Sequence, residues 1–343
     1  MHTKVFARIK TYSHDTKLNR FEQTISKPIP ATLIHAGQME NREQSLVILS
    51  GASGMLGTAL RRGLSSRQNP TLQLVRSLPT GAGQLQWNPA ASPAISHPAP
   101  LEESAAAIHL SGASVAGHRW TAAYQRELAA SRVDSTRALA IALARLHQPP
   151  RALLVASAVG FYGNRADEVL SESSAPGSGF LAGLCQSWEA AADPAVQAGI
   201  RVVHFRFGVV LGQGHGALEQ MLPPFRLGLG AKLGNGRQWM SWISLEDAVA
   251  GILFALDTPA LVGPVNLTAP NPVTNADFTR ALGRQLGRPA FLTIPSLAVR
   301  LAFGKMANEA LLASARVLPV RLQSAGFQFV HPTVQAALAA ALA

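Results

Sequence analysis

Three glycines, Gly51, Gly54 and Gly57, have a spacing that could bind a phosphate group. They directly follow the apolar run Leu46–Leu49, which predicts a buried parallel strand, and an apolar helical pattern begins immediately after them. Glycine permits a sharp turn, lets the backbone approach a pyrophosphate, and lets the helix pack closely on its strand. The helix N-terminus adds unpaired N–H groups and a partial positive charge. This order predicts a dinucleotide-binding loop, in which the glycines and their neighbours contact the ligand: Ser53, Met55 and Leu56.

The choice of nucleotide follows from which charges are present beyond this loop. NAD-specific sites place Asp or Glu about 20 residues past the glycines, where it binds the ribose 2′-hydroxyl. Between Glu43 and Glu102 the chain has no acidic residue, whereas Arg76 follows the second predicted strand. A guanidinium can bind a 2′-phosphate in a bidentate, charge-assisted geometry. We therefore expect NADP(H), with Arg76 as its phosphate ligand; the alternative for Arg76 is a solvated surface residue.

Strands and helices that alternate along the chain must position this loop. The predicted strands are Leu46–Leu49, Leu72–Val75, Ala107–Leu110, Ala152–Ser157 and Val202–Val210, and the longer helices span about Thr121–His147 and Phe180–Ala192. Such alternation predicts an α/β fold, a Rossmann-type doubly wound parallel sheet with right-handed crossovers. We expect a poorly ordered extension over 1–44, an NADP-binding domain over 45–212, and a small substrate-covering lobe over 213–343 that returns some elements to the core.

Composition describes a soluble globular protein in 343 residues, with 48% hydrophobic and 14% charged residues. No apolar run approaches the roughly 18 residues of a membrane helix. The single cysteine, Cys185, excludes an intramolecular disulfide and a cysteine-cluster zinc site, and no metal-ligand spacing is present. The net charge of +11 comes from dispersed arginines and few acids, so we expect no nucleic-acid partner. We expect a cytoplasmic protein without membrane contact, either a monomer or a homodimer.

Several short motifs together resemble a known superfamily, the extended short-chain dehydrogenase/reductases. The likeness spans about Leu46 to Leu342 and is closest to the atypical branch of NAD-dependent epimerase/dehydratase-like proteins. Its motifs include the glycine loop, Trp87-Asn-Pro89, His109-Leu-Ser-Gly-Ala-Ser114, Arg119-Trp120, Ser131-Arg-Val-Asp-Ser-Thr136, Ser157-Ala-Val-Gly-Phe-Tyr-Gly163, Trp188-Glu189 and Trp242-Ile-Ser-Leu-Glu-Asp247. The resemblance implies a Rossmann domain with a small C-terminal lobe and NADP contacts at Arg76, Ser111, Gly112, Glu127 and Arg132.

The chain departs from this superfamily at its catalytic pair, Tyr-x-x-x-Lys. In that pair the lysine charge lowers the tyrosine pKa, so that the phenol can exchange a proton with substrate during hydride transfer. None of the three tyrosines here has a lysine four residues on, and no lysine occurs between Lys27 and Lys232. Phe180 stands where the tyrosine is expected. The cofactor site is therefore predicted to be intact without the usual proton-transfer groups.

Few residues remain as replacements. Tyr162 follows the predicted strand Ala152–Ser157 at the ligand-binding edge, and is either catalytic or packed under the nicotinamide end of the cofactor. Ser157 lies next to the expected position of the family's catalytic serine. Arg206 is costly to bury unpaired, so it either anchors a substrate anion or pairs with a buried carboxylate such as Asp247. Further candidates to contact substrate are Arg119, Trp120 and Trp239.

These observations predict an NADP(H)-binding oxidoreductase or epimerase-like enzyme that acts on an unidentified small molecule. The missing Tyr/Lys pair keeps a second hypothesis open, a non-catalytic regulator or scaffold that binds NADPH.

Overall fold

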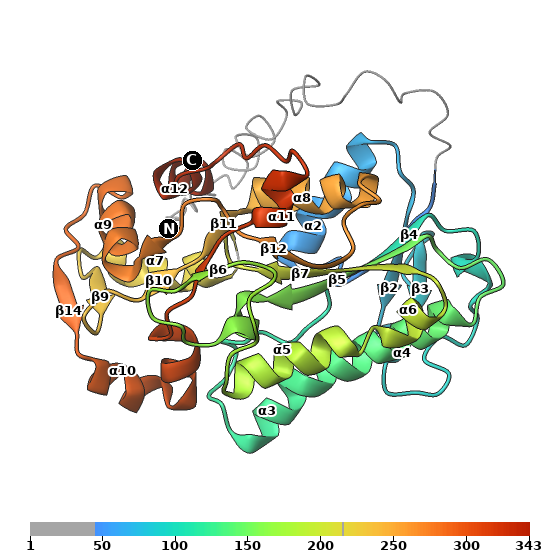
Figure 1. Ribbon diagram of the computed structural model, residues 1–343, viewed down its shortest axis with the longest axis horizontal. Helices are drawn as coiled ribbons and strands as arrows, with labels where there is room; N and C mark the ends of the chain where they lie inside the picture. Colours follow the sequence, from blue (N-terminus) through green and yellow to red (C-terminus); the bar gives the residue numbers. More distant parts are fainter. Residues whose placement is uncertain (1–44, 215) are drawn as a thin grey trace, which may run out of the picture. The chain divides into compact units, whose positions relative to one another are not determined.

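The computed structural model describes residues 45–214 and 216–343, so the predicted extension over 1–44 lies outside the described residues. Within the described part, seven strands form a parallel sheet in the order β12-β7-β5-β4-β1-β2-β3 (Figure 1). These strands are β1 (Val47–Ser50), β2 (Thr71–Val75), β3 (Gln84–Gln86), β4 (Ala106–His109), β5 (Ala152–Ala158), β7 (Arg201–Phe207) and β12 (Gly263–Leu267). The strand order changes direction at β1, the point where such sheets bind ligands. The predicted Rossmann-type α/β fold is confirmed.

Helices cover both faces of the sheet (Figure 1). On one face, α2 (Met55–Ser66) and α8 (Leu245–Asp257) pack on alternate sheet residues such as Leu49. On the other face, α4 (Ser135–Ala144), α5 (Phe180–Ala190) and α6 (Asp193–Gln197) pack on the intervening residues such as Ile48. All four β1 residues are buried, as the continuous apolar run predicts for a strand covered on both faces.

The helix predicted over Thr121–His147 is interrupted. It consists of α3 (Ala122–Ala129), a π-helical turn called η3 (Ala130–Asp134), and α4, which ends at Ala144. A π turn inserts one residue into an otherwise continuous helical pattern, so hydrophobic periodicity does not reveal it. Such turns occur frequently at functional sites, and this one carries a residue of the cavity described below.

Two further predictions about strands differ from the structure. The strand predicted over Val202–Val210 leaves the sheet after Phe207, and β8 (Val209–Leu211) pairs instead with β11 (Trp242–Ser244). A Cβ at Gly208 would lie 2.7 Å from the Ser241 backbone oxygen, so this switch of partner requires glycine. The sheet also contains the short edge strand β3, which is not among the strands predicted from the sequence.

Elements after residue 212 build a second core and also return to the sheet. The second core packs residues of α7, α9 and α12 around the buried Trp242 of β11, whereas α8 and β12 belong to the central layers. The remaining elements are η2 (Ala99–Leu101), η4 (Val159–Tyr162), β6 (Val169–Leu170), α7 (Ala217–Arg226), β9 (Ala231–Leu233), β10 (Trp239–Met240), β13 (Val273–Thr274), α9 (Asn275–Gln285), β14 (Leu292–Ile294), α10 (Ser296–Phe303), η5 (Ala307–Leu311), β15 (Arg316–Val317), α11 (Val320–Ser324) and α12 (Val334–Leu342). Among the described residues, no helix is long and apolar enough to cross a membrane.

Candidate active site

A cavity of about 340 Å³ opens at the carboxyl ends of the central strands. It runs from the glycine loop between β1 and α2 to the inner face of α5. The lining residues are Gly51, Gly54, Met55, Leu56, Gly57, Leu110, Val115, Arg132, Ala156, Ser157, Ala158, Leu181, Leu184, Cys185, Trp188, Phe207 and Val210. The cavity thus brings the predicted cofactor loop together with Arg132 and Ser157, which are 75 or more residues away in the sequence.

Each glycine of the loop meets a different steric requirement. Gly51 has φ of +75°, and a Cβ there would lie 2.7 Å from the carbonyl carbon of Leu110 at the end of β4. A Cβ at Gly57 would lie 2.1 Å from the Gly51 oxygen, so glycine lets α2 pack directly on the turn. At Gly54 the nearest atom is 3.6 Å away, and the residue is exposed toward the open side. Gly54 therefore leaves room for a ligand, while the other two shape the protein itself.

The N-terminus of α2 is prepared for an anion. Gly54 is the N-cap residue, and no acidic residue stands in the first turn. Within 45–214 and 216–343, no capping side chain accepts a hydrogen bond from the first N–H groups. These N–H groups keep their donors and the positive end of the helix dipole for a ligand. A pyrophosphate meets both requirements.

Arg132 extends from the π turn into the cavity. Its Nη2 donates to the Ala113 carbonyl at 2.8 Å, and its guanidinium carbon lies 5.1 Å from the centre of the Trp188 ring. The neighbouring Ser131 hydroxyl accepts a hydrogen bond from the Ala113 N–H at 3.1 Å. Burial lowers the pKa of Arg132 from its usual value, yet arginine remains charged at neutral pH. The π turn therefore fixes a cation against the loop that follows β4.

Other predicted cofactor residues lie outside the cavity lining. Arg76 is exposed immediately after β2, the strand beside β1. Ser111 and Gly112 follow β4, and a Cβ at Gly112 would lie 3.4 Å from the Arg132 guanidinium carbon. Glu127 is exposed on α3, and Ser53 is exposed in the glycine loop. Their contacts with a cofactor stay predictions.

Sequence reasoning missed a buried histidine beside the site. His109 ends β4, and its two ring nitrogens hydrogen-bond the Ser50 hydroxyl at 2.5 Å and the Ser135 hydroxyl at 3.1 Å. Burial lowers its pKa to about 4, so the ring is neutral at physiological pH. His109 therefore joins β1, β4 and α4 as a structural hydrogen-bonding group. Its position at the end of the apolar run of β4 is the sequence feature that could have indicated a buried histidine.

The structure separates the two predicted catalytic residues. Ser157 lines the cavity, and its hydroxyl donates to Glu189 Oε1 at 2.8 Å. Tyr162 is fully buried in η4 and is not part of the lining. Its hydroxyl donates to Asn266 Oδ1 at 2.6 Å and accepts from Arg206 Nη1 at 3.0 Å. The Tyr162 hydroxyl is therefore engaged inside the protein by Asn266 and Arg206, and its predicted catalytic role stays a prediction.

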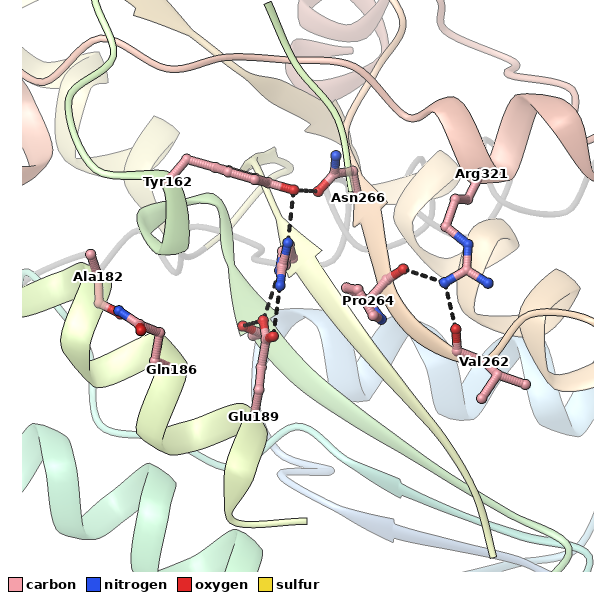
Figure 2. A network of polar contacts seen from close by, with 10 residues as sticks. Tyr162, Ala182, Gln186, Glu189, Val262, Pro264, Asn266 and Arg321 are labelled. Carbon is pink, nitrogen blue, oxygen red and sulfur yellow. Dashed lines mark hydrogen bonds and ion pairs between the residues drawn. The ribbon is translucent and has the colours of Figure 1, made fainter. Parts of the chain in front are cut away.

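Arg206 is the centre of this polar network, which is drawn in Figure 2. Its Nε and Nη2 each donate to one Glu189 carboxylate oxygen at 2.8 Å. Burial lowers its pKa, but the hydrogen bond and charge of Glu189 outweigh burial, so the net direction is upward. Figure 2 shows Tyr162 and Asn266 pointing toward one another, with dashed contacts continuing to Glu189. For Tyr162, burial raises the pKa despite the opposing effects of Arg206 and Asn266.

Of the alternatives for Arg206, the structure selects a buried carboxylate partner. That partner is Glu189, and Asp247 instead accepts hydrogen bonds from the backbone N–H groups of Val330 and His331 at 2.7 and 2.9 Å. Arg206 is 3% exposed and does not line the cavity, so its predicted role as a substrate anchor has no contact in this structure to support it and stays a prediction.

The other predicted substrate residues also lie away from the cavity lining. Trp120 is buried, donates to the Val115 carbonyl at 2.8 Å, and packs edge-on against Phe180. Arg119 is exposed and donates to the Leu301 carbonyl at 3.3 Å. Trp239 donates to Asp167 at 2.9 Å and stacks under Arg316. Each of the three residues thus has a partner within the protein, and their predicted contact with substrate stays a prediction.

The end of the cavity that faces α5 is apolar. Leu181, Leu184, Cys185 and Trp188 line it from α5, and Phe207 lines it from β7. Burial raises the pKa of the Cys185 thiol to about 12, so the thiol stays protonated. Ser157 is the hydroxyl-bearing residue of the lining at this end. Among the described residues, no cluster of His, Cys, Asp or Glu could hold a metal ion.

Two family models match this chain. Residues 47–267 match the NAD dependent epimerase/dehydratase family, and residues 294–341 match a domain of unknown function, DUF1731. The first match includes the whole cavity lining and all seven strands of the central sheet.

Similar proteins extend over nearly the same length. An epimerase family protein of Mycobacterium bovis is 47% identical over 86% of this chain and 96% of its own length. The human epimerase family protein SDR39U1 is 36% identical over 85% of this chain and 98% of its own length. A crystal structure of human SDR39U1 (isoform 2) with NADPH covers 86% of this chain and 98% of that chain, with a TM-score of 0.78 and 35% identity.

Proposed function

Because the chain belongs to the NAD-dependent epimerase/dehydratase family, we propose that it binds NADP(H) and is an oxidoreductase or epimerase-like enzyme for a small molecule. One observation carries the proposal: a single cavity joins the glycine loop to Ser157 and the apolar face of α5. A dinucleotide bound at the loop would direct its nicotinamide toward the far end of this cavity. There the nicotinamide could accept a hydride from, or give one to, a carbon of the substrate.

The residues of this chain fit a phosphorylated dinucleotide. The free N–H groups at the start of α2 suit the pyrophosphate, since Gly54 leaves space in front of them. Arg132 adds a positive charge to the same cavity. The exposed Arg76 follows β2, where a ribose 2′-phosphate is expected, and no acidic residue occurs between Glu43 and Glu102. The NADPH in the human relative's structure supports the same choice.

Calorimetric titration with NADPH and NADH tests this cofactor choice. We expect tighter binding of NADPH, and we expect Arg76→Ala to weaken NADPH binding by about 1.5–3 kcal/mol, roughly 10- to 150-fold in Kd, while NADH binding stays unchanged. Arg145→Ala is the matched control, because this arginine is equally exposed but is the C-cap residue of α4 and does not line the cavity. Equal affinity of the wild type for both cofactors would refute the preference for NADP(H).

A second candidate function is a regulator that binds NADPH without turnover. It is favoured by one observation: α5 presents Phe180 and Leu184 where the related enzymes carry the Tyr/Lys pair. Incubation with NADPH and a panel of carbonyl compounds separates the two functions. Steady NADPH oxidation with any of them supports the enzyme, and binding without oxidation supports the regulator.

A further inference from the structure

We propose that Ser157 and Glu189 act together as the proton acceptor of this site and that they serve the oxidation of a hydroxyl group on an apolar substrate. The inference rests on the proposed NADP(H)-dependent function. It begins with position: Ser157 stands at the carboxyl end of β5 in the cavity lining. Its hydroxyl donates to Glu189 Oε1 at 2.8 Å, and Glu189 lies behind it on α5.

Arg206 holds the carboxylate in one orientation. Two parallel hydrogen bonds of 2.8 Å join its guanidinium to both Glu189 oxygens, and the two side chains are 4% and 13% exposed. Bidentate pairs of this kind fix geometry as well as charge. Tyr162 and Asn266 complete the support, because Arg206 donates to Tyr162, Tyr162 donates to Asn266, and Asn266 donates to the Leu318 carbonyl at 2.9 Å.

The direction of these hydrogen bonds determines what Ser157 can offer a ligand. Its proton points to Glu189, so its oxygen lone pairs remain for the cavity, where they can accept a hydrogen bond. A substrate hydroxyl is a suitable donor. The neighbouring lining is apolar and consists of Leu181, Leu184 and Trp188 on α5. The site therefore favours a secondary alcohol with an apolar body over a charged or heavily hydroxylated one.

The chemical step balances with the oxidised cofactor as hydride acceptor. The substrate O–H proton moves to Ser157 Oγ while the Ser157 proton moves to Glu189 Oε1. The carbinol carbon loses its hydrogen with the electron pair to the nicotinamide, and a C=O bond forms. The products are a ketone, the reduced cofactor and a neutral Glu189, which then returns its proton to solvent. The reverse reaction passes through the same neutral Glu189, which would return its proton through Ser157 to the alkoxide oxygen as the hydride is given back.

The test uses NADP⁺ with racemic 1-phenylethanol as an apolar alcohol, and NADPH with acetophenone for the reverse direction. We expect Ser157→Ala and Glu189→Gln each to lower kcat for oxidation by ~10²–10⁴-fold, the usual contribution of a positioned base. Because the two residues act as one unit, the double variant should lose no more than the poorer single variant. Ser157→Thr should keep activity, since it keeps the hydroxyl. Glu168→Gln, in the half-exposed pair with Arg165, is the matched control and should retain wild-type turnover.

Infrared difference spectra give a readout independent of turnover rate. When NADP⁺ and the alcohol are mixed with stoichiometric protein, time-resolved spectra should show a protonated carboxyl band in the wild type before the proton returns to solvent, and no such band in Glu189→Gln. Ser157→Ala keeps the Glu189–Arg206 pair, so calorimetry should show unchanged NADPH affinity in this variant. If Glu189→Gln does not fold, the loss of turnover in Ser157→Ala is the test.

The outcomes separate this inference from the function on which it rests. Oxidation that survives in Ser157→Ala, or a wild type without the carboxyl band, overturns the inference and leaves the enzyme function standing. A wild type that converts other compounds of the carbonyl panel but neither probe overturns the inference alone, whereas binding of NADPH without turnover of any compound of the panel overturns both.

Discussion

Two alanine substitutions in the glycine loop should have different effects: Gly57→Ala should lower the stability of the fold, and Gly54→Ala should weaken cofactor binding. At Gly57 the added methyl would lie 2.1 Å from the Gly51 oxygen and 2.9 Å from the Ala52 Cα, both backbone atoms. At Gly54 the nearest atom is 3.6 Å away, and the backbone angles of φ −71° and ψ 168° are ordinary for alanine. The same chemical change therefore strains the protein at one position and occupies ligand space at the other.

The magnitudes follow from this geometry. Overlap with fixed backbone should cost Gly57→Ala about 3 kcal/mol, the upper part of the usual overpacking range. The better helix propensity of alanine returns about 1 kcal/mol. The net loss of ~2 kcal/mol corresponds to a fall in Tm of roughly 3 °C for a folded part of about 300 residues. Gly54→Ala should cost at most ~1 kcal/mol through the N-cap, but should weaken NADPH binding by ~1–3 kcal/mol because the methyl crowds the pyrophosphate.

Scanning calorimetry of both variants measures stability, and titration with NADPH at a temperature where both are folded measures affinity. Each variant is the control for the other. The reasoning is refuted if Gly57→Ala melts with the wild type, or if Gly54→Ala binds NADPH with wild-type affinity.

Three further predictions concern buried polar groups. Burial lowers the pKa of His109 to about 4 in the folded protein, against 6.5 for an ordinary histidine, so on acidification the unfolded chain takes up the proton first. The free energy of unfolding should therefore fall by roughly 3 kcal/mol as the pH drops from 6.5 to 4. Urea titrations measure this fall, which should be smaller in His109→Gln. Tyr162→Phe leaves Asn266 without its donor and Arg206 without an acceptor, so urea unfolding should show a loss of ~1–3 kcal/mol while calorimetry shows unchanged NADPH affinity. Glu309 accepts hydrogen bonds from the first two N–H groups of α5 at 2.9 and 2.7 Å, so Glu309→Gln should lower stability by about 1 kcal/mol in the same assay.

The features that sequence reasoning identified are local ones. The apolar run before Gly51 and the glycine spacing depend on neighbours within a dozen residues, and both appear in the structure as β1 and the turn into α2. The strand alternation likewise predicted the sheet. The π turn escaped detection because one inserted residue hardly alters a helical pattern, although it is this turn that carries Arg132 into the cavity.

The functional network could not be predicted because its contacts are tertiary. The apolar setting of Arg206 indicated a buried carboxylate, but the strand pattern does not state which helix covers that face of β7. Glu189 on α5 and Asp247 on α8 were both possible by composition, and α5 is the helix that packs on the side of Arg206. For Tyr162, the sequence placed the residue after β5 but gave no information on the direction of its side chain, which points to Asn266 rather than into the cavity.

In the mechanism that we propose, α5 still supplies a proton-transfer group, but this group is Glu189 and lies farther along the helix than the usual Tyr/Lys pair would. The resemblance to the short-chain dehydrogenase/reductases places the pair near Phe180 and Leu184. Glu189 lies five residues beyond Leu184, about 7.5 Å along the helix axis at 1.5 Å per residue. Ser157 also belongs to the sheet, because it is the next-to-last residue of β5 and precedes η4 in the chain. A substrate hydroxyl that reaches Ser157 must therefore enter deeper toward the sheet than one bound by a tyrosine at position 180. This depth explains why an apolar lining suits the site: a substrate that passes Leu181 and Leu184 must leave its hydration behind before it meets Ser157.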